Sequence, residues 1–148
     1  MPAKDFLDTN VLIYAVAKND ARASKAETVL ASGGMVSVQS LNEFVSVARR
    51  KLGMSWKEIK EFLELIGILC PNPVPVSVDI HNAALVIAEK YGYGIYHALI
   101  ASAAIEAGCK TLYSEDLQDG QIINRQLTIR NPFPEGLNEI VLPNSRAW

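Results

Sequence analysis

The sequence predicts an α/β fold in which a central parallel β-sheet is flanked by helices, an α/β/α sandwich. Short apolar runs alternate with longer segments of helical periodicity, which is the pattern of successive βαβ units. No internal repeat, low-complexity tract or Pro/Gly-rich linker divides the 148 residues. We therefore expect one domain spanning residues 1–148.

The first part of the chain reads as a strand ending at Asp8, followed by helices and a second strand. Glycines at 33 and 34 and at 53 mark helix ends. Ser55 and Glu58 match a capping box, so a further helix is expected to begin at Ser55. Before it, the predicted elements are a strand at 6–8, a helix through 11–15, a helix at 22–31, a strand at 35–38 and a helix through 41–52.

The second part begins after the break "CPNPVP" and continues the alternation of strands and helices. One helix there is apolar at nearly every position from Ala98 to Ile105, yet it carries His97 in its first turn. A tail containing Pro132, Pro134 and Pro143 is expected to be extended. The predicted elements are a strand at 74–78, a helix at 79–91, the histidine helix, a strand at 110–114 and a strand at 127–131.

Composition limits the classes of function. The chain is 49% apolar but has no run long enough to cross a bilayer, and its charged N-terminus does not resemble a signal peptide. We therefore expect a cytoplasmic protein without a membrane segment. The net charge of −2 lacks the basic excess typical of nucleic-acid binding, although metal bound by acidic side chains would offset part of the negative charge.

Acidic residues follow three of the predicted strands. Asp8 closes the first strand, Glu43 is expected in the first helical turn after the second strand, and Asp116 follows the strand at 110–114. The carboxyl ends of parallel strands meet at one edge of the sheet, where ligands bind. Asp119, three residues after Asp116, either joins these acids or forms the turn.

Gathered carboxylates raise one another's pKa, and a divalent cation removes that cost. Mg²⁺ and Mn²⁺ prefer oxygen ligands and complete their coordination shells with water and phosphate oxygens. The pattern therefore indicates hydrolysis of phosphate esters by a nuclease or phosphatase. Each acid also has a structural alternative, since Asp8 can cap a helix, Glu43 can favour a helix dipole, and Asp116 can form a turn.

Four segments, in order and spacing, resemble the PIN-domain nucleases, and more narrowly the VapC-type toxins of prokaryotic toxin–antitoxin pairs. They are "FLDTNVLIYA", "SLNEFVSVARR", "IYHALIASAAIEAGCKTLYSEDLQDG" and "LTIRNPF". The resemblance implies a single PIN-like domain and a metal-dependent endoribonuclease using Mg²⁺ or Mn²⁺. It also implies an RNA substrate and a cognate antitoxin as partner.

The resemblance places the family's metal ligands on Asp8, Glu43 and Asp116, with Asp119 adjacent. A further acidic position of the family falls on His97, which is a departure from the pattern. Because His97 stands in the first turn of a buried helix, we expect its ring to point past the helix end toward the acids. It either contacts the metal or is satisfied by a neighbouring carboxylate.

Asn10 and Ser114 either hydrogen-bond the metal-binding carboxylates or serve only in local capping and turns. We also expect a homodimer, because the apolar Leu30, Val45 and Ile66 are difficult to place together in one small core. A phosphatase with Asp8 as nucleophile is disfavoured, since such enzymes usually carry a second Asp where Asn10 stands. The remaining alternative is a PIN-fold module that binds RNA or protein, with a metal site weakened by His97.

Overall fold

The computed structural model describes residues 4–17 and 19–133, and its centre is a four-stranded sheet in the order β1-β2-β4-β3. The strands are β1 (Phe6–Leu7), β2 (Thr111–Tyr113), β3 (Ile122–Ile123) and β4 (Leu127–Arg130). Strand β2 pairs in parallel with both β1 and β4, whereas β3 is antiparallel to β4. The sheet is thus mostly parallel as predicted, with β3 as an antiparallel edge strand that the sequence analysis missed.

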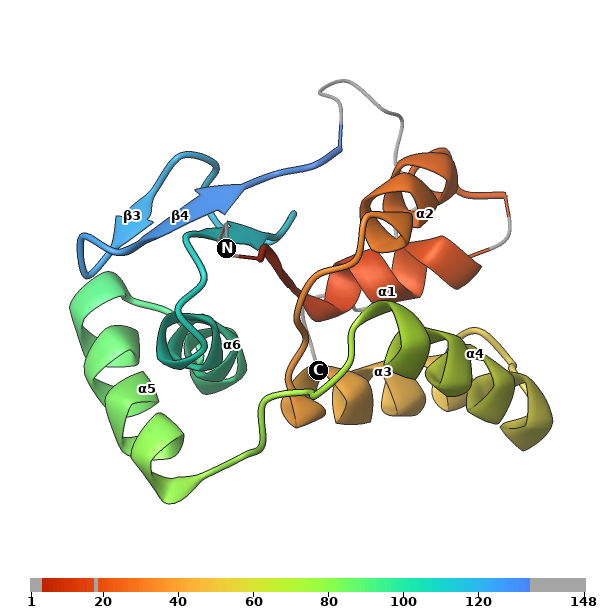
Figure 1. Cartoon of the computed structure of the whole chain (residues 1–148), viewed down its shortest axis with the longest axis horizontal. Helices are drawn as coiled ribbons and strands as arrows, with labels where there is room; N and C mark the ends of the chain where they lie inside the picture. The colour runs from red at the N-terminus through yellow and green to blue at the C-terminus, as the bar shows by residue number, and fades with distance from the viewer. Residues whose placement is uncertain (1–3, 18, 134–148) are drawn as a thin grey trace.

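The helices cover both faces of the sheet, which confirms the sandwich (Figure 1). Helices α1 to α4 pack on one side, and α5 and α6 pack together on the other. Their bounds are α1 (Thr9–Val16), α2 (Ala23–Ala31), α3 (Val38–Arg50), α4 (Trp56–Leu69), α5 (Val78–Tyr91) and α6 (Ile95–Glu106).

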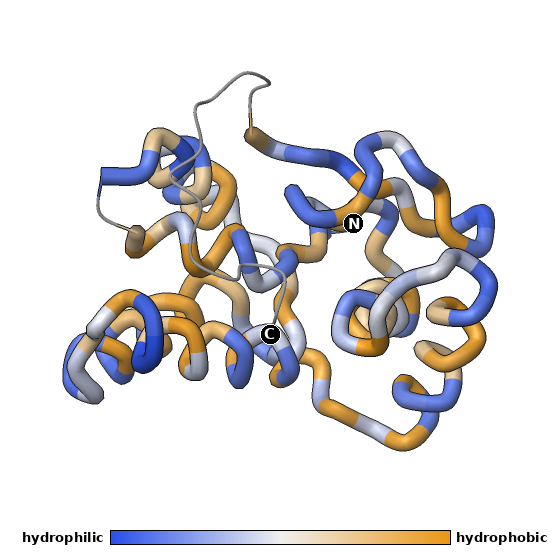
Figure 2. The backbone as a smooth tube through the Cα atoms, turned by 180° about the vertical axis from the view of Figure 1, so that it is seen from behind, coloured by the Kyte–Doolittle hydropathy of each residue, from blue (hydrophilic) through white to orange (hydrophobic). Residues whose placement is uncertain are grey.

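The two residues of β1 contribute to two different hydrophobic cores. Phe6 belongs to the core formed with α5 and α6, and Leu7 to the core formed with α1 to α4, because successive side chains of a strand point to opposite faces. Figure 2 shows hydrophobic and hydrophilic bands alternating along the helices, as expected for helices with one face on a core. Within the described residues, no helix is long and apolar enough to cross a membrane.

The strands expected at 35–38 and 74–78 are reduced to isolated parallel bridges, Phe6 with Met35 and Ser37 with Val74. Ser37 and Ser77 cap α3 and α5 with their side chains, so the chain turns helical at the next residue. Val74 also lies between two prolines, which lack the N–H that a ladder requires. The cap at Ser37 also begins α3 earlier than predicted, which places Glu43 in the second turn and not the first.

The buried cores correct one argument for a homodimer. Leu30 and Ile66 are 3% and 1% exposed, and Val45 packs against the same cluster, so the core beside α1 accommodates all three. Of the tail prolines, Pro132 is described, whereas Pro134 and Pro143 lie outside the described residues.

Candidate metal centre

Asp8 occupies the junction between β1 and α1 and is 1% exposed. As the N-cap of α1 it has an extended backbone, and its Oδ1 accepts a hydrogen bond of 2.6 Å from the backbone N–H of Thr9. Its Oδ2 accepts a second bond of 2.6 Å from the Ser114 hydroxyl. The residue therefore caps the helix with one oxygen while the other faces the end of the sheet.

Parallel pairing of β1 with β2 brings the second segment to the same place. Leu7 pairs with Tyr113, and the N–H of Asp8 donates to the carbonyl of Tyr113, so Ser114 follows directly beside Asp8. The Ser114 hydroxyl also accepts from the N–H of Asp116 at 3.2 Å. The carboxyl ends of two adjacent strands thus deliver the Asp8 and Asp116 carboxylates to one site.

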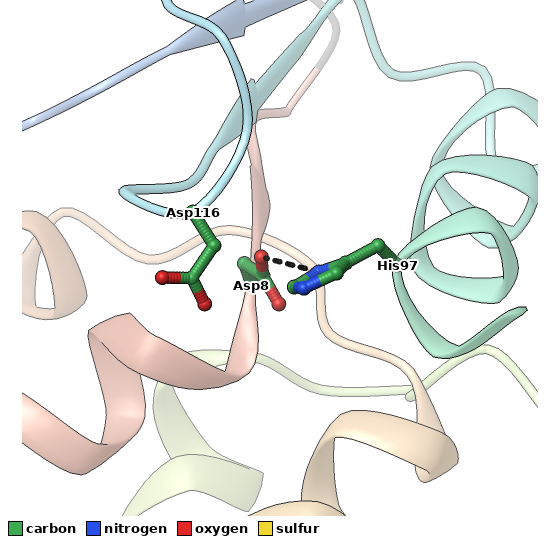
Figure 3. A group of neighbouring side chains, drawn as sticks. All are labelled: Asp8, His97 and Asp116. Carbon is green, nitrogen blue, oxygen red and sulfur yellow. Dashed lines mark ion pairs between the residues drawn. The ribbon is translucent and has the colours of Figure 1, made fainter. Parts of the chain in front are cut away.

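His97 reaches this site from the first turn of α6, on the opposite layer (Figure 3). Its Nδ1 lies 3.8 Å from Asp8 Oδ2, and its side chain is 25% exposed. One ligand atom each from Asp8, His97 and Asp116 lie within 4.8 Å of one another. The histidine ring therefore faces the acids, which is the orientation expected from the sequence.

Glu43 reaches the same region from α3 and is linked to Asp8 through Thr9. The Thr9 hydroxyl donates to Glu43 Oε2 at 2.7 Å, while the N–H of Thr9 donates to Asp8. Glu43 is 6% exposed and lies outside the group of three that Asp8, His97 and Asp116 form. We call Asp8, Glu43, His97 and Asp116 together the Asp8 cluster.

Burial and mutual repulsion make two acids of the Asp8 cluster hard to ionise. Burial raises the pKa of Glu43 to about 7; the charge of Asp8 acts in the same direction, and the hydrogen bond from Thr9 opposes it. Burial likewise raises the pKa of Asp116 to about 6, again with the charge of Asp8 acting in the same direction. The charge of His97 lowers both values, but it does not restore ordinary acidity.

The donor atoms of the cluster fit a divalent cation. Glu43 Oε1, Asp116 Oδ2 and His97 Nδ1 are buried without a hydrogen-bond partner, as are both polar atoms of Asn10. Buried polar atoms are normally paired, and unpaired carboxylate and imidazole atoms are suitable ligands for a divalent metal ion. A bound cation would also reverse the repulsion that raises the two carboxyl pKa values.

Comparison with known proteins identifies the family. The model of the PIN domain matches residues 6–118, a range that contains all four members of the Asp8 cluster. The chain belongs to the PIN domain family. A comparison with curated proteins found no match.

Solved structures with the same PIN fold belong to toxin–antitoxin systems. A toxin–antitoxin complex from Klebsiella pneumoniae has a TM-score of 0.66 and 17% identity, covering 87% of this chain and 98% of that chain. VapBC2 from Rickettsia felis, bound to a promoter DNA fragment, gives 0.60 and 20%, covering 86% and 98%. VapC20 from Mycobacterium tuberculosis, a sarcin–ricin loop cleaving toxin, gives 0.56 and 20%, covering 76% and 89%. At these identities the likeness shows a shared fold.

Two other residues, Asp119 and Asn10, were expected in the site of this PIN domain. Asp119 is exposed, and its Oδ1 accepts from the N–H of Asn131 at 2.8 Å, so the structure shows it joining the loop to the end of β4. Asn10 is 1% exposed; it approaches Asp116 and lowers the pKa of that carboxyl, although neither of its polar atoms has a hydrogen bond of good geometry.

The contact of Thr9 with Glu43 is one that the sequence did not reveal. The backbone N–H of Thr9 donates to Asp8 and its hydroxyl donates to Glu43, two acids that are 35 positions apart and that only their shared sheet edge brings together. The motif "DTN" contained the signal that could have found it, since a hydroxyl beside a buried acid needs a partner.

Proposed function

We propose that this PIN domain, residues 1–148, is a divalent-cation-dependent endoribonuclease and the toxin of a prokaryotic toxin–antitoxin pair, acting in the cytoplasm. Asp8, Glu43 and Asp116 would hold Mg²⁺ or Mn²⁺, with His97 as a further ligand. Asp119, the secondary candidate, would contribute only if the loop that carries it moved. The observation that carries the proposal is the set of unpaired buried donor atoms in the Asp8 cluster.

The residues of the cluster have distinct tasks in this proposal. The cation, when bound, would supply an activated water and offset the charge that develops on the scissile phosphate. Ser114 and Thr9 orient Asp8 by donating to its two oxygens, and Thr9 also orients Glu43. The carboxylates exclude an RNA phosphate until a cation neutralises them, so metal and RNA should bind together.

An antitoxin protein is the proposed partner, supported by the shared fold with toxins in toxin–antitoxin complexes. We also propose a homodimer, although the reason first offered by the sequence does not hold. The better support is a set of large apolar side chains exposed on α5, namely Val78, Leu85 and Val86 at 72%, 49% and 64% exposure.

His97 favours a second candidate function. Because histidine replaces a carboxylate where the family has an acid, the site loses one negative charge and should hold Mg²⁺ weakly. The protein would then bind RNA or protein without cleaving, as a catalytically weakened PIN module. The absence of any cleavage by wild-type protein in either Mg²⁺ or Mn²⁺ would favour this candidate.

Calorimetry with Mn²⁺ tests the proposed site directly. The double variant Asp8→Asn, Asp116→Asn should bind Mn²⁺ at least about 100-fold more weakly than wild type, because two anionic ligands are lost. Asp79→Asn, at an exposed position on α5, is the matched control and should bind as wild type does. Equal affinity of wild type and the double variant would contradict the site, and RNA cleavage that persists in EDTA would contradict the mechanism.

A further inference from the structure

A second buried polar cluster lies directly beside the Asp8 cluster and has no part in the proposed chemistry. It consists of Tyr14, Asp20, Arg22 and Glu115, and we call it the Arg22 cluster. Arg22 is 2% exposed, and its Nε and Nη2 donate to the two carboxylate oxygens of Asp20, each at 2.9 Å. Its Nη1 donates to Glu115 Oε1 at 2.8 Å. The guanidinium therefore joins the start of α2 to the connection that follows β2.

Tyr14 of α1 holds the same Glu115 oxygen from a different direction. Its hydroxyl donates to Glu115 Oε1 at 2.7 Å, and the guanidinium carbon of Arg22 lies 3.9 Å from the centre of its ring. The ring also meets Phe133 edge-on with centroids 5.2 Å apart, so the phenol cannot swing away without disturbing the core. The Tyr14 hydroxyl and the Arg22 guanidinium both donate to Glu115 Oε1, and these two hydrogen bonds fix the Glu115 side chain.

The position of Glu115 in the chain gives these contacts a consequence for the metal centre. The segment Ser114, Glu115, Asp116 is anchored on one side by the Ser114 hydroxyl, which donates to Asp8. It is anchored on the other side by Glu115, which points away from the Asp8 cluster into the Arg22 cluster. The N–H of Asp116 donates to the Ser114 hydroxyl, so the position of the Asp116 carboxylate depends on both anchors.

We infer that Tyr14 and Arg22 are positioning residues that act through Glu115 to hold Asp116 within ligand distance of Asp8 and His97. The inference rests on the proposed metal site for its functional meaning. Arg22 has a second effect, since its positive charge offsets part of the negative charge that Glu115 places next to Asp116. The Arg22 cluster thus sets both the geometry and the local charge of one ligand without touching the metal.

Tyr14→Phe tests the inference, with Tyr93→Phe as a matched control. Each variant removes one phenol hydroxyl that donates to a side-chain Oε1, but Tyr93 bonds Gln121 at the beginning of the β-hairpin. Hydrogen–deuterium exchange in the metal-free protein should become about threefold to tenfold faster at the Asp116 amide in Tyr14→Phe, because one anchor is lost. The control should leave this amide unchanged. Mn²⁺ affinity should fall by about the same factor in Tyr14→Phe alone.

Arg22→Lys provides an independent variant that keeps the buried charge but cannot span both carboxylates. It should reproduce the local exchange at Asp116 and the loss of Mn²⁺ affinity. Unchanged exchange at Asp116 in both variants would overturn the inference, as would faster exchange with wild-type Mn²⁺ affinity. If wild type itself bound no Mn²⁺ while exchange responded as expected, the proposed metal site would fail but the anchoring of Asp116 would stand.

Discussion

The Asp8 cluster and the Arg22 cluster are both buried groups of acids with one basic side chain, yet they differ in how their charges are satisfied. In the Arg22 cluster, burial alone would raise the pKa of Asp20, but hydrogen bonds and charge from Arg22 lower it overall. In the Asp8 cluster, burial raises the pKa of Glu43 to about 7 and that of Asp116 to about 6, and donor atoms stay unpaired.

The boundary between the two clusters falls between consecutive residues, Glu115 and Asp116. Glu115 is paired with Arg22, whereas Asp116 has an oxygen without a partner and a neighbour of like charge. The difference shows how adjacent acids of one loop can serve stability and ligand binding separately. A cluster whose charged atoms find hydrogen-bond partners within the protein holds the fold, and one whose atoms do not is suited to an external cation.

The largest expected effect in this comparison is the loss of stability when the positive charge of Arg22 is removed. Arg22→Gln leaves two buried carboxylates without a counter-charge and should lower the free energy of unfolding by about 3 to 5 kcal/mol, measured by urea denaturation. Arg49→Gln is the control, because Arg49 also lies over an aromatic ring, that of Trp56, but is exposed. The control should cost less than about 1 kcal/mol. Similar costs for the two variants would remove the contrast.

A smaller effect is expected when the Asp8 cluster receives the acid that the family pattern places at position 97. His97→Asp adds an anionic oxygen ligand, and Mg²⁺ should bind about tenfold more tightly, with higher Mg²⁺-dependent RNA cleavage or toxicity in cells. Wild type should instead favour Mn²⁺, because imidazole suits Mn²⁺ better than Mg²⁺. A folded variant no more active than wild type in Mg²⁺, or a wild type fully active in Mg²⁺, would contradict this expectation.

A further effect concerns the pH dependence of stability without metal. Glu43 and Asp116 bind protons more tightly in the folded protein, so between about pH 4 and 7 the folded state holds more protons than the unfolded chain. The free energy of unfolding should therefore fall as pH rises through this range, by up to about 6 kcal/mol if both shifts are expressed in full. Thermal unfolding in EDTA would show it.

One variant and one measurement with metal separate this pH effect from general acid sensitivity. Glu43→Gln should flatten the dependence, because one of the two titrating groups is removed. Saturating Mn²⁺ should reverse its sign, since the metal favours deprotonated ligands. Asp20 contributes only below its ordinary pKa range, where its own stabilisation is lost as pH falls, so it acts outside this window. A flat metal-free profile would argue against strongly perturbed carboxyls.

Much of the fold follows from local signals in the sequence. The helix cap at Ser55 and the apolar run of α6 depend on neighbouring residues, and they locate helices to within one or two positions. The strand expected at 127–131 is β4, but the hairpin that it forms with β3 was missed because β3 has only 2 residues. Its turn also uses Asn124 and Arg125 at φ of 51° and 57°, and arginine gives no turn signal of the Asn-Gly kind.

The candidate metal site could be predicted only in part from the sequence. Asp8 and Asp116 follow strands whose parallel pairing can be predicted from topology, so their meeting could be expected. Tyr14 and Arg22 share the partner Glu115, which is 101 and 93 positions away from them, and no pattern or spacing along the chain marks such pairs. Side-chain contacts between separate elements become visible only once the layers are packed.

The prolines that flank Val74 have a consequence for self-association. Val74 forms one bridge to Ser37 at this border of the strand arrangement, and Pro73 and Pro75 present no N–H to an incoming strand. At the opposite border, β3 offers only two residues for pairing. Neither border can template growth into a continuous intermolecular sheet, so the protein should resist edge-to-edge polymerisation. Any dimer should instead form through side chains on its helices.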